Sequence, residues 1–129
     1  MFAHSDASLK NGIATHSYIL RTYKGRKVKE IAYVSHETNS VKAEIDSLVK
    51  LLNYCASKNY KGLKIYSDCK PVVDSCNNKA KLKIDTSYLK HMLNSTGSKI
   101  KWKSRLKNSE ADQCCRKLMK VVQNRINNT

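Results

Sequence analysis

The sequence has few residues that would divide it into separate units. Its 129 residues include one proline, Pro71, and four glycines, and no segment is repetitive or rich in either residue. Linkers between domains are commonly rich in proline, glycine or polar residues. We therefore expect residues 1–129 to form a single domain, which is long enough to fold without disulfide bonds.

Long apolar runs are also missing. No run approaches the roughly 20 residues that a membrane-spanning helix needs, and the N-terminus lacks the apolar core of a secretory signal. We therefore expect a cytoplasmic protein with no membrane partner. The five cysteines are odd in number and none forms a Cys-x-x-Cys pair, which disfavours a zinc site. Reduced thiols packed among apolar side chains are the simpler interpretation.

Acidic side chains are scarce. The chain has 10 Asp and Glu against 25 Lys and Arg, which leaves a formal net charge of +15. This excess predicts an acidic partner, most commonly a nucleic acid. Four carboxylates stand out because they fall at the expected ends of strands and helices: Asp6, Glu44, Asp68 and Asp112. We interpret them as ligands that hold divalent cations against a polyanion.

Hydrophobic periodicity predicts five strands and four helices. The strands are expected at residues 1–8, 13–22, 27–36, 63–67 and 99–103, with a turn at Asn11-Gly12. The helices are expected at 41–58 with Ser40 as N-cap, from Pro71 to about 77, after Asp85, and from Asn108 or Ser109 to about 126. A hairpin meander followed by crossover connections predicts an α/β fold, with a five-stranded mixed sheet flanked by helices.

Asp6 and Asp68 should converge if the first strand lies beside the fourth. Asp6 and Asp68 lie near strand ends, where sites gather in α/β sheets. Glu44 and Asp112 fall in the expected first turns of helices, which stabilise negative charge. Oxygen ligands favour Mg²⁺ or Mn²⁺. Two such ions about 4 Å apart can activate a water and stabilise a leaving oxygen.

Short motifs around these acids occur in an ordered series: Ser5-Asp6-Ala7-Ser8, Thr38-Asn39 followed by Ala43-Glu44, Tyr66-Ser67-Asp68, and Arg105-x-x-Asn108-x-x-Ala111-Asp112. Over about residues 1–122 the series resembles the type 1 ribonuclease H family. That resemblance implies a ribonuclease H-like fold and an endonuclease with two Mg²⁺ or Mn²⁺ ions. The family hydrolyses the RNA strand of RNA/DNA hybrids and leaves a 3′-hydroxyl and a 5′-phosphate.

The resemblance also implies a role for each acid. Asp6 would bridge both ions and Asp112 would hold the ion that activates water. Glu44 and Asp68 would hold the other ion, and Glu44 would sense a 2′-hydroxyl. The residues expected to contact nucleic acid are Ser8, Asn11, Asn39, Lys70, Lys79, Lys81, Lys83 and Arg105.

The sequence departs from the family at two places near the site. Ala7 stands where a glycine is usual, and Arg105 stands in a loop where many members carry a histidine. Trp102, the sole tryptophan, is expected to pack in the core.

Three alternatives to a ribonuclease H remain open. They are a non-catalytic nucleic-acid binder on the same fold, a DNA-directed nuclease such as a junction resolvase, and a domain of a reverse transcriptase. We expect the chain to be a monomer.

Overall fold

The computed structural model describes residues 1–104 and 109–127. Its elements follow the predicted order and lie within about two residues of the predicted boundaries. They are β1 (Phe2–Lys10), β2 (Ile13–Arg21), β3 (Lys27–His36), α1 (Ser40–Ser57), β4 (Lys64–Ser67), α2 (Lys70–Cys76), α3 (Ser87–Ser95), β5 (Lys99–Trp102) and α4 (Ser109–Asn127).

The strands form one mixed sheet in the order β3-β2-β1-β4-β5. The pairs β1/β2 and β2/β3 are antiparallel, whereas β1/β4 and β4/β5 are parallel. Asn11 and Gly12 both have positive φ, 53° and 75°, which is the conformation that a two-residue hairpin turn requires. The five-stranded mixed sheet predicted from the sequence is therefore confirmed.

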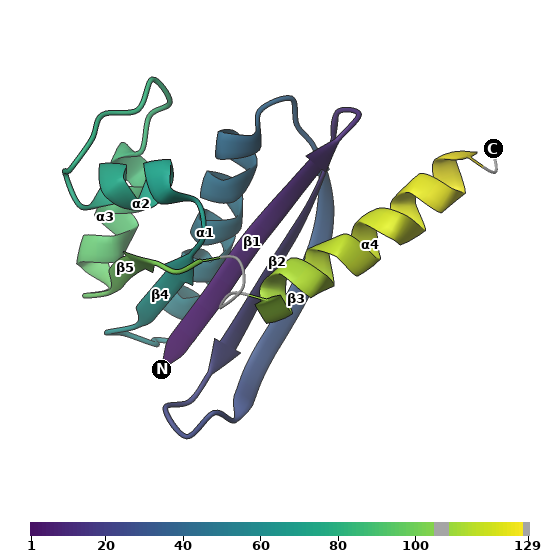
Figure 1. Cartoon of the computed structure of the whole chain (residues 1–129). Helices are drawn as coiled ribbons and strands as arrows, with labels where there is room; N and C mark the ends of the chain where they lie inside the picture. Colours follow the sequence, from purple (N-terminus) through teal and green to yellow (C-terminus); the bar gives the residue numbers. More distant parts are fainter. Residues whose placement is uncertain (105–108, 128–129) are drawn as a thin grey trace.

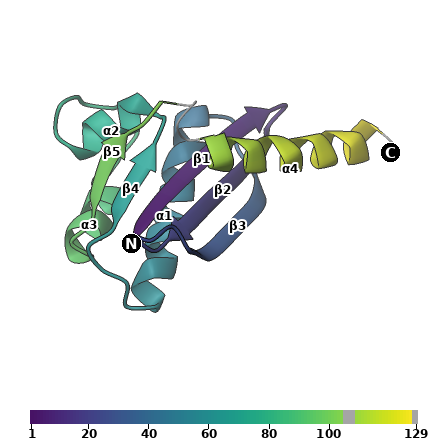
Figure 2. The same cartoon turned by 60° about the horizontal axis from the view of Figure 1, so that its bottom comes forward.

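Helices cover the two faces of the sheet unequally (Figures 1 and 2). On one face, α1, α2 and α3 enclose the main apolar core, which includes Leu48, Leu52, Ile65 and Leu89. On the other face, α4 crosses β1 and β2 and continues beyond the sheet edge. None of the described helices combines the length and apolar character needed to cross a membrane.

The start of α1 differs from the prediction. Ser40 is the first helical residue, and Asn39 is the N-cap because its amide oxygen accepts the N–H groups of Val41 and Lys42. Glu44 consequently lies beyond the first turn, so the expected stabilisation of its charge by the helix N-terminus is wrong. Asp112 does lie in the first turn of α4. The side chains of the two candidate caps of α4 lie outside the described residues.

Candidate active site

The pairing of β1 with β4 places two of the four acids side by side. Their parallel register ends with Ser5 opposite Ser67. Asp6 follows Ser5 and Asp68 follows Ser67, so the two acids meet at the point where β4 ends. The predicted convergence of Asp6 with Asp68 is confirmed, because strand one does lie beside strand four.

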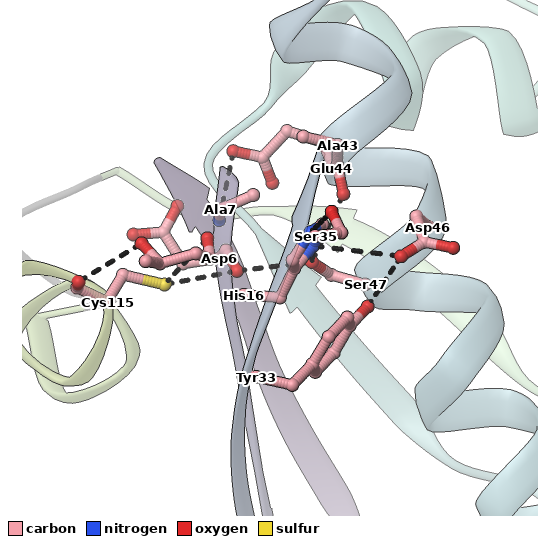
Figure 3. A network of polar contacts seen from close by, with 11 residues as sticks. Asp6, Ala7, His16, Tyr33, Ser35, Ala43, Glu44, Asp46, Ser47 and Cys115 are labelled. Atoms are coloured by element: carbon pink, nitrogen blue, oxygen red, sulfur yellow. Dashed lines mark hydrogen bonds and ion pairs between the residues drawn. The ribbon is translucent and has the colours of Figure 1, made fainter. Parts of the chain in front are cut away.

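Glu44 reaches this point from α1. Its Oε1 accepts the backbone N–H of Ala7 at 3.3 Å (Figure 3). Asp6, Glu44 and Asp68 each offer a carboxylate oxygen, and these atoms lie within 4.8 Å of one another. Residues from three segments that are distant in the sequence thus form one acidic cluster, Asp6, Glu44 and Asp68.

Asp112 approaches from the helix on the opposite face of the sheet. Ser17 of β2 donates a hydrogen bond to the carbonyl of Ala111 at 2.7 Å, which anchors the first turn of α4. Asp112 lies close enough to Asp6 for its hydrogen bond and charge to raise the pKa of Asp6. Its carboxylate also pairs with Nε of Arg116 at 3.0 Å. The structure therefore brings three of the four acids into one cluster, and Asp112 interacts with that cluster through Asp6.

Two of the carboxylates have strongly raised pKa values. Burial, followed by the charge of Asp68, raises the pKa of Asp6 to about 8. Burial and the charges of Asp6 and Asp68 raise the pKa of Glu44 well above its usual value. Asp6 Oδ1 and Glu44 Oε2 are buried, and no donor among the described residues reaches them. Buried carboxylate oxygens that lack donors fit a hard divalent cation, which would supply the missing positive charge.

These pKa values predict a pH-dependent stability in EDTA. Between the unfolded pKa of Asp6, 3.8, and its folded pKa of about 8, the folded state binds more protons than the unfolded state. Stability should therefore fall as the pH rises through this window, by about 1.4 kcal/mol per pH unit for one such group.

Thermal unfolding in EDTA at about pH 6.5, 7.5 and 8.5 measures this effect. Each kcal/mol should lower the melting temperature by roughly 3–5 °C. Millimolar Mn²⁺ should raise the melting temperature most at the highest pH, because the ionised cluster binds it best. A melting temperature that rises with pH in EDTA would contradict the assigned burial of the acids.

A hollow of about 330 Å³ opens beside the acidic cluster. It is lined by Ala7, Ser8, Leu9, Ser40, Glu44, Asp68 and Cys69. Ser8 therefore lines the hollow, and its contact with nucleic acid stays a prediction. Ser40 and Cys69 also line the hollow and were not among the predicted site residues. Asn11 lies at the exposed hairpin tip and the amide oxygen of Asn39 caps α1, so neither lines the hollow.

The predicted lysine contacts are distributed more widely. Lys70 lies over the ring of Trp102, with Nζ 5.9 Å from the centroid, and Lys79 lines a groove between α2 and β5. Lys81 and Lys83 are exposed on the connection before α3. Arg105 lies outside the described residues. The nucleic-acid contacts of these side chains stay predictions.

A buried polar network supports the site from beneath (Figure 3). His16 is fully buried, stacks on Tyr33 at a centroid distance of 4.3 Å, and contacts Ser47 Oγ and Ser35 Oγ at 2.7 Å each. Burial lowers the pKa of His16, so its ring is neutral near pH 7. Ser47 Oγ donates toward the carbonyl of Asp6 at 3.3 Å or that of Ala43 at 3.2 Å.

Both ring nitrogens of His16 have a hydroxyl partner, Ser47 at Nδ1 and Ser35 at Nε2. His16 is therefore connected through Ser47 to the backbone of Asp6. The sequence did not reveal this connection, because the three residues lie on different elements.

Solved structures with the same fold include several ribonucleases H. Ribonuclease H1 from the halophilic archaeon Halobacterium salinarum NRC-1 has a TM-score of 0.81 and 17% identity, covering 92% of this chain and 96% of that one. The N-terminal ribonuclease H domain of rv2228c from Mycobacterium tuberculosis has a TM-score of 0.82 and 17% identity, covering 97% and 96%. LC11 ribonuclease H1, isolated from compost and solved with an RNA/DNA hybrid, has a TM-score of 0.78 and 17% identity, covering 90% and 94%.

Sequence comparison defines the family. No curated protein matches the chain. The model of the family described as "Reverse transcriptase-like" matches residues 4–118, a span that contains the three acids of the cluster and Asp112. With that match over most of its length and the ribonuclease H-like fold, the chain belongs to the reverse transcriptase-like family.

Proposed function

We propose that the protein is a divalent-cation-dependent endoribonuclease that hydrolyses the RNA strand of RNA/DNA hybrids and leaves 3′-hydroxyl and 5′-phosphate ends. The observation that carries the proposal is the acidic cluster, in which Asp6, Glu44 and Asp68 present oxygens within 4.8 Å of one another. The net charge of +15 supports a polyanionic substrate. The fold shared with LC11 ribonuclease H1, which was solved with a hybrid, supports the substrate class.

Each acid has a distinct place in this proposal. Asp6, at the centre of the cluster, would contribute to both cation sites, with Glu44 and Asp68 completing one and Asp112 the other. Two bound Mg²⁺ or Mn²⁺ ions would activate the attacking water and stabilise the leaving oxygen. Glu44 also lines the hollow beside Ser8, where its carboxylate can accept a hydrogen bond from a 2′-hydroxyl. That hydroxyl is the group by which a protein tells RNA from DNA.

Cleavage of labelled substrates tests the proposal. In Mg²⁺ or Mn²⁺ we expect the protein to cut the RNA strand of a hybrid, and to leave duplex DNA and the DNA strand of the hybrid intact. An EDTA reaction is the blank, and end-group analysis of the products checks for 3′-hydroxyls. Hybrid cleavage no greater than the blank would reject the proposal. Faster cleavage of branched DNA than of the hybrid would favour a resolvase-like nuclease.

A non-catalytic binder is the second candidate. The ion pair between Arg116 and Asp112 favours it, because the guanidinium already balances the charge of the fourth acid. A binder of this kind would hold the hybrid with a steep dependence on salt, as expected when lysines displace counterions from phosphates, and would leave both strands uncut.

A further inference from the structure

A second concave surface lies outside the acidic cluster, at the edge of the sheet. It runs between α2 and the edge strand β5 and encloses about 610 Å³. We call it the α2/β5 groove, and its polar lining is mainly cationic: Lys70, Asn77, Lys79, Lys99 and Lys101. Asp74 is the one acid among the residues that line it. Four lysines against one acid make this groove a surface for an anion.

The groove contains an aromatic side chain that the core does not use. Trp102 is 51% exposed, so the prediction that it packs in the core is wrong. Its Nε1 donates a hydrogen bond to the carbonyl of Asp68 at 3.2 Å, which satisfies the indole N–H and holds the ring. Lys70 Nζ lies 5.9 Å from the ring centroid. A held, half-exposed indole flanked by lysines has the character of a stacking platform.

The α2/β5 groove adjoins the candidate active site. Asp68 and Cys69 line the hollow beside the acids, and Lys70, the next residue, lines the groove. The groove walls are tied together, because Asn77 Nδ2 donates to the carbonyl of Ile100 at 3.1 Å. The hollow and the groove are therefore neighbours, since Trp102 of the groove also contacts the carbonyl of Asp68.

The combination of groups selects the kind of strand. Lysines attract phosphates of any nucleic acid, but an indole face stacks only with a base whose own face is free. Bases inside a duplex are already stacked on their neighbours. We propose that the α2/β5 groove binds an unpaired segment of a nucleic-acid strand, continuous with the substrate in the hollow, with one base stacked on Trp102 and its phosphates on Lys99 and Lys101. This inference rests on the proposed function for the identity of that substrate.

Trp102 is the sole tryptophan, so its emission reports on the groove directly. The experiment titrates the full chain, in EDTA to prevent cleavage, with a blunt RNA/DNA hybrid and with the same hybrid carrying a single-stranded overhang. We expect the overhang to quench Trp102 emission and to tighten binding by roughly tenfold, the scale of one stacked base. An overhang that neither quenches the emission nor tightens binding would overturn the site.

Charge reversal tests whether the preference for the overhang depends on the lysines of the groove. Lys99→Glu combined with Lys101→Glu should remove most of the overhang preference. The matched control is Lys24→Glu combined with Arg26→Glu, because these exposed residues carry the same charge in the turn before β3, at the opposite edge of the sheet from β5. The control should keep the preference. Equal losses in the two double variants would show that general charge, and not the groove, is responsible, and would overturn the proposal.

Replacing the ring separates stacking from charge. Trp102→Leu should lose the overhang preference, whereas Trp102→Phe, which keeps an aromatic face, should retain part of it. Hybrid cleavage by the wild type in Mg²⁺, measured on the same preparation, distinguishes the two proposals. Quenching without cleavage supports the groove and rejects the nuclease, whereas cleavage without overhang quenching rejects the groove alone.

Discussion

Asp6→Asn should reduce hybrid cleavage by roughly a thousandfold or more, since a lost cation site removes several kcal/mol of transition-state stabilisation. The loss of cleavage should be largest at Asp6, because this acid lies among Glu44, Asp68 and Asp112 and is only 1% exposed. An amide of the same shape keeps the packing but cannot carry the charge that holds a cation. Initial rates on labelled hybrid at saturating Mg²⁺ measure the effect.

The same substitution should have the opposite effect on stability in EDTA. Burial and the charge of Asp68 raise the pKa of Asp6 to about 8, so the wild type must hold a buried carboxyl that would ionise freely once unfolded. Asparagine has no such cost, and its advantage should grow with pH up to about 8. Gains of about 1–3 kcal/mol are expected from thermal or urea unfolding.

Glu30→Gln is the matched control for Asp6→Asn. It also neutralises one acid, but Glu30 lies on β3 and pairs with Lys27, away from the cluster. It should change neither the cleavage rate by more than a few fold nor the stability by more than about 0.5 kcal/mol. An Asp6→Asn protein that cleaves within tenfold of the wild type would show that the acidic cluster is not the active site.

His16→Leu should destabilise the fold by about 2–4 kcal/mol, a fall in melting temperature of roughly 10 °C. The substitution removes both ring nitrogens from the buried network and leaves the hydroxyls of Ser47 and Ser35 without their shortest partner. It also removes the ring that stacks on Tyr33. Thermal and urea unfolding at pH 7, where the wild-type ring is neutral, measure the loss.

His36→Leu controls for the loss of a histidine. His36 is exposed at the end of β3, so its replacement should alter the stability by less than about 0.5 kcal/mol. A His16→Leu protein as stable as the wild type would show that the buried contacts of the ring contribute nothing. Because Ser47 also contacts the Asp6 carbonyl, a weaker response to Mn²⁺ in the same unfolding assay would show that the network positions the acid.

Local patterns in the chain predicted the elements well, and the reasons are local. The Asn11-Gly12 turn follows from two residues that tolerate positive φ. The long helix follows from apolar residues at helical spacing, including Leu48, Leu51 and Leu52, all buried against the sheet. The cluster could also be anticipated in part, since Asp6 on β1 and Asp68 directly after β4 meet once these strands are parallel neighbours. The expectation that Asp6 lies near the end of its strand was wrong, because pairing with β2 continues β1 to Lys10.

Two further predictions from the sequence were wrong, the N-cap of α1 and the burial of Trp102. The first failed because two neighbouring residues are both good caps, and the second because tertiary packing determines burial. Asn39 and Ser40 are both good caps, and the extended backbone of Asn39, with φ −128° and ψ 124°, made it the cap. That shift of one residue carried Glu44 out of the first turn. Trp102 was expected inside because of its size, but β5 is an edge strand and leaves the ring half outside.

The sequence alone was sufficient for the order of strands and helices, the excess of positive charge, and the identity of four unusual acids, because each of these depends on composition or on neighbours within a few positions. Tertiary structure was needed for the distances among those acids, their burial and raised pKa values, the His16 network and the α2/β5 groove. These properties depend on the register of paired strands and on contacts such as Cys115 with Asp6, 109 positions apart. Short-range propensity contains no information about such contacts, so only the folded chain brings their chemistry together.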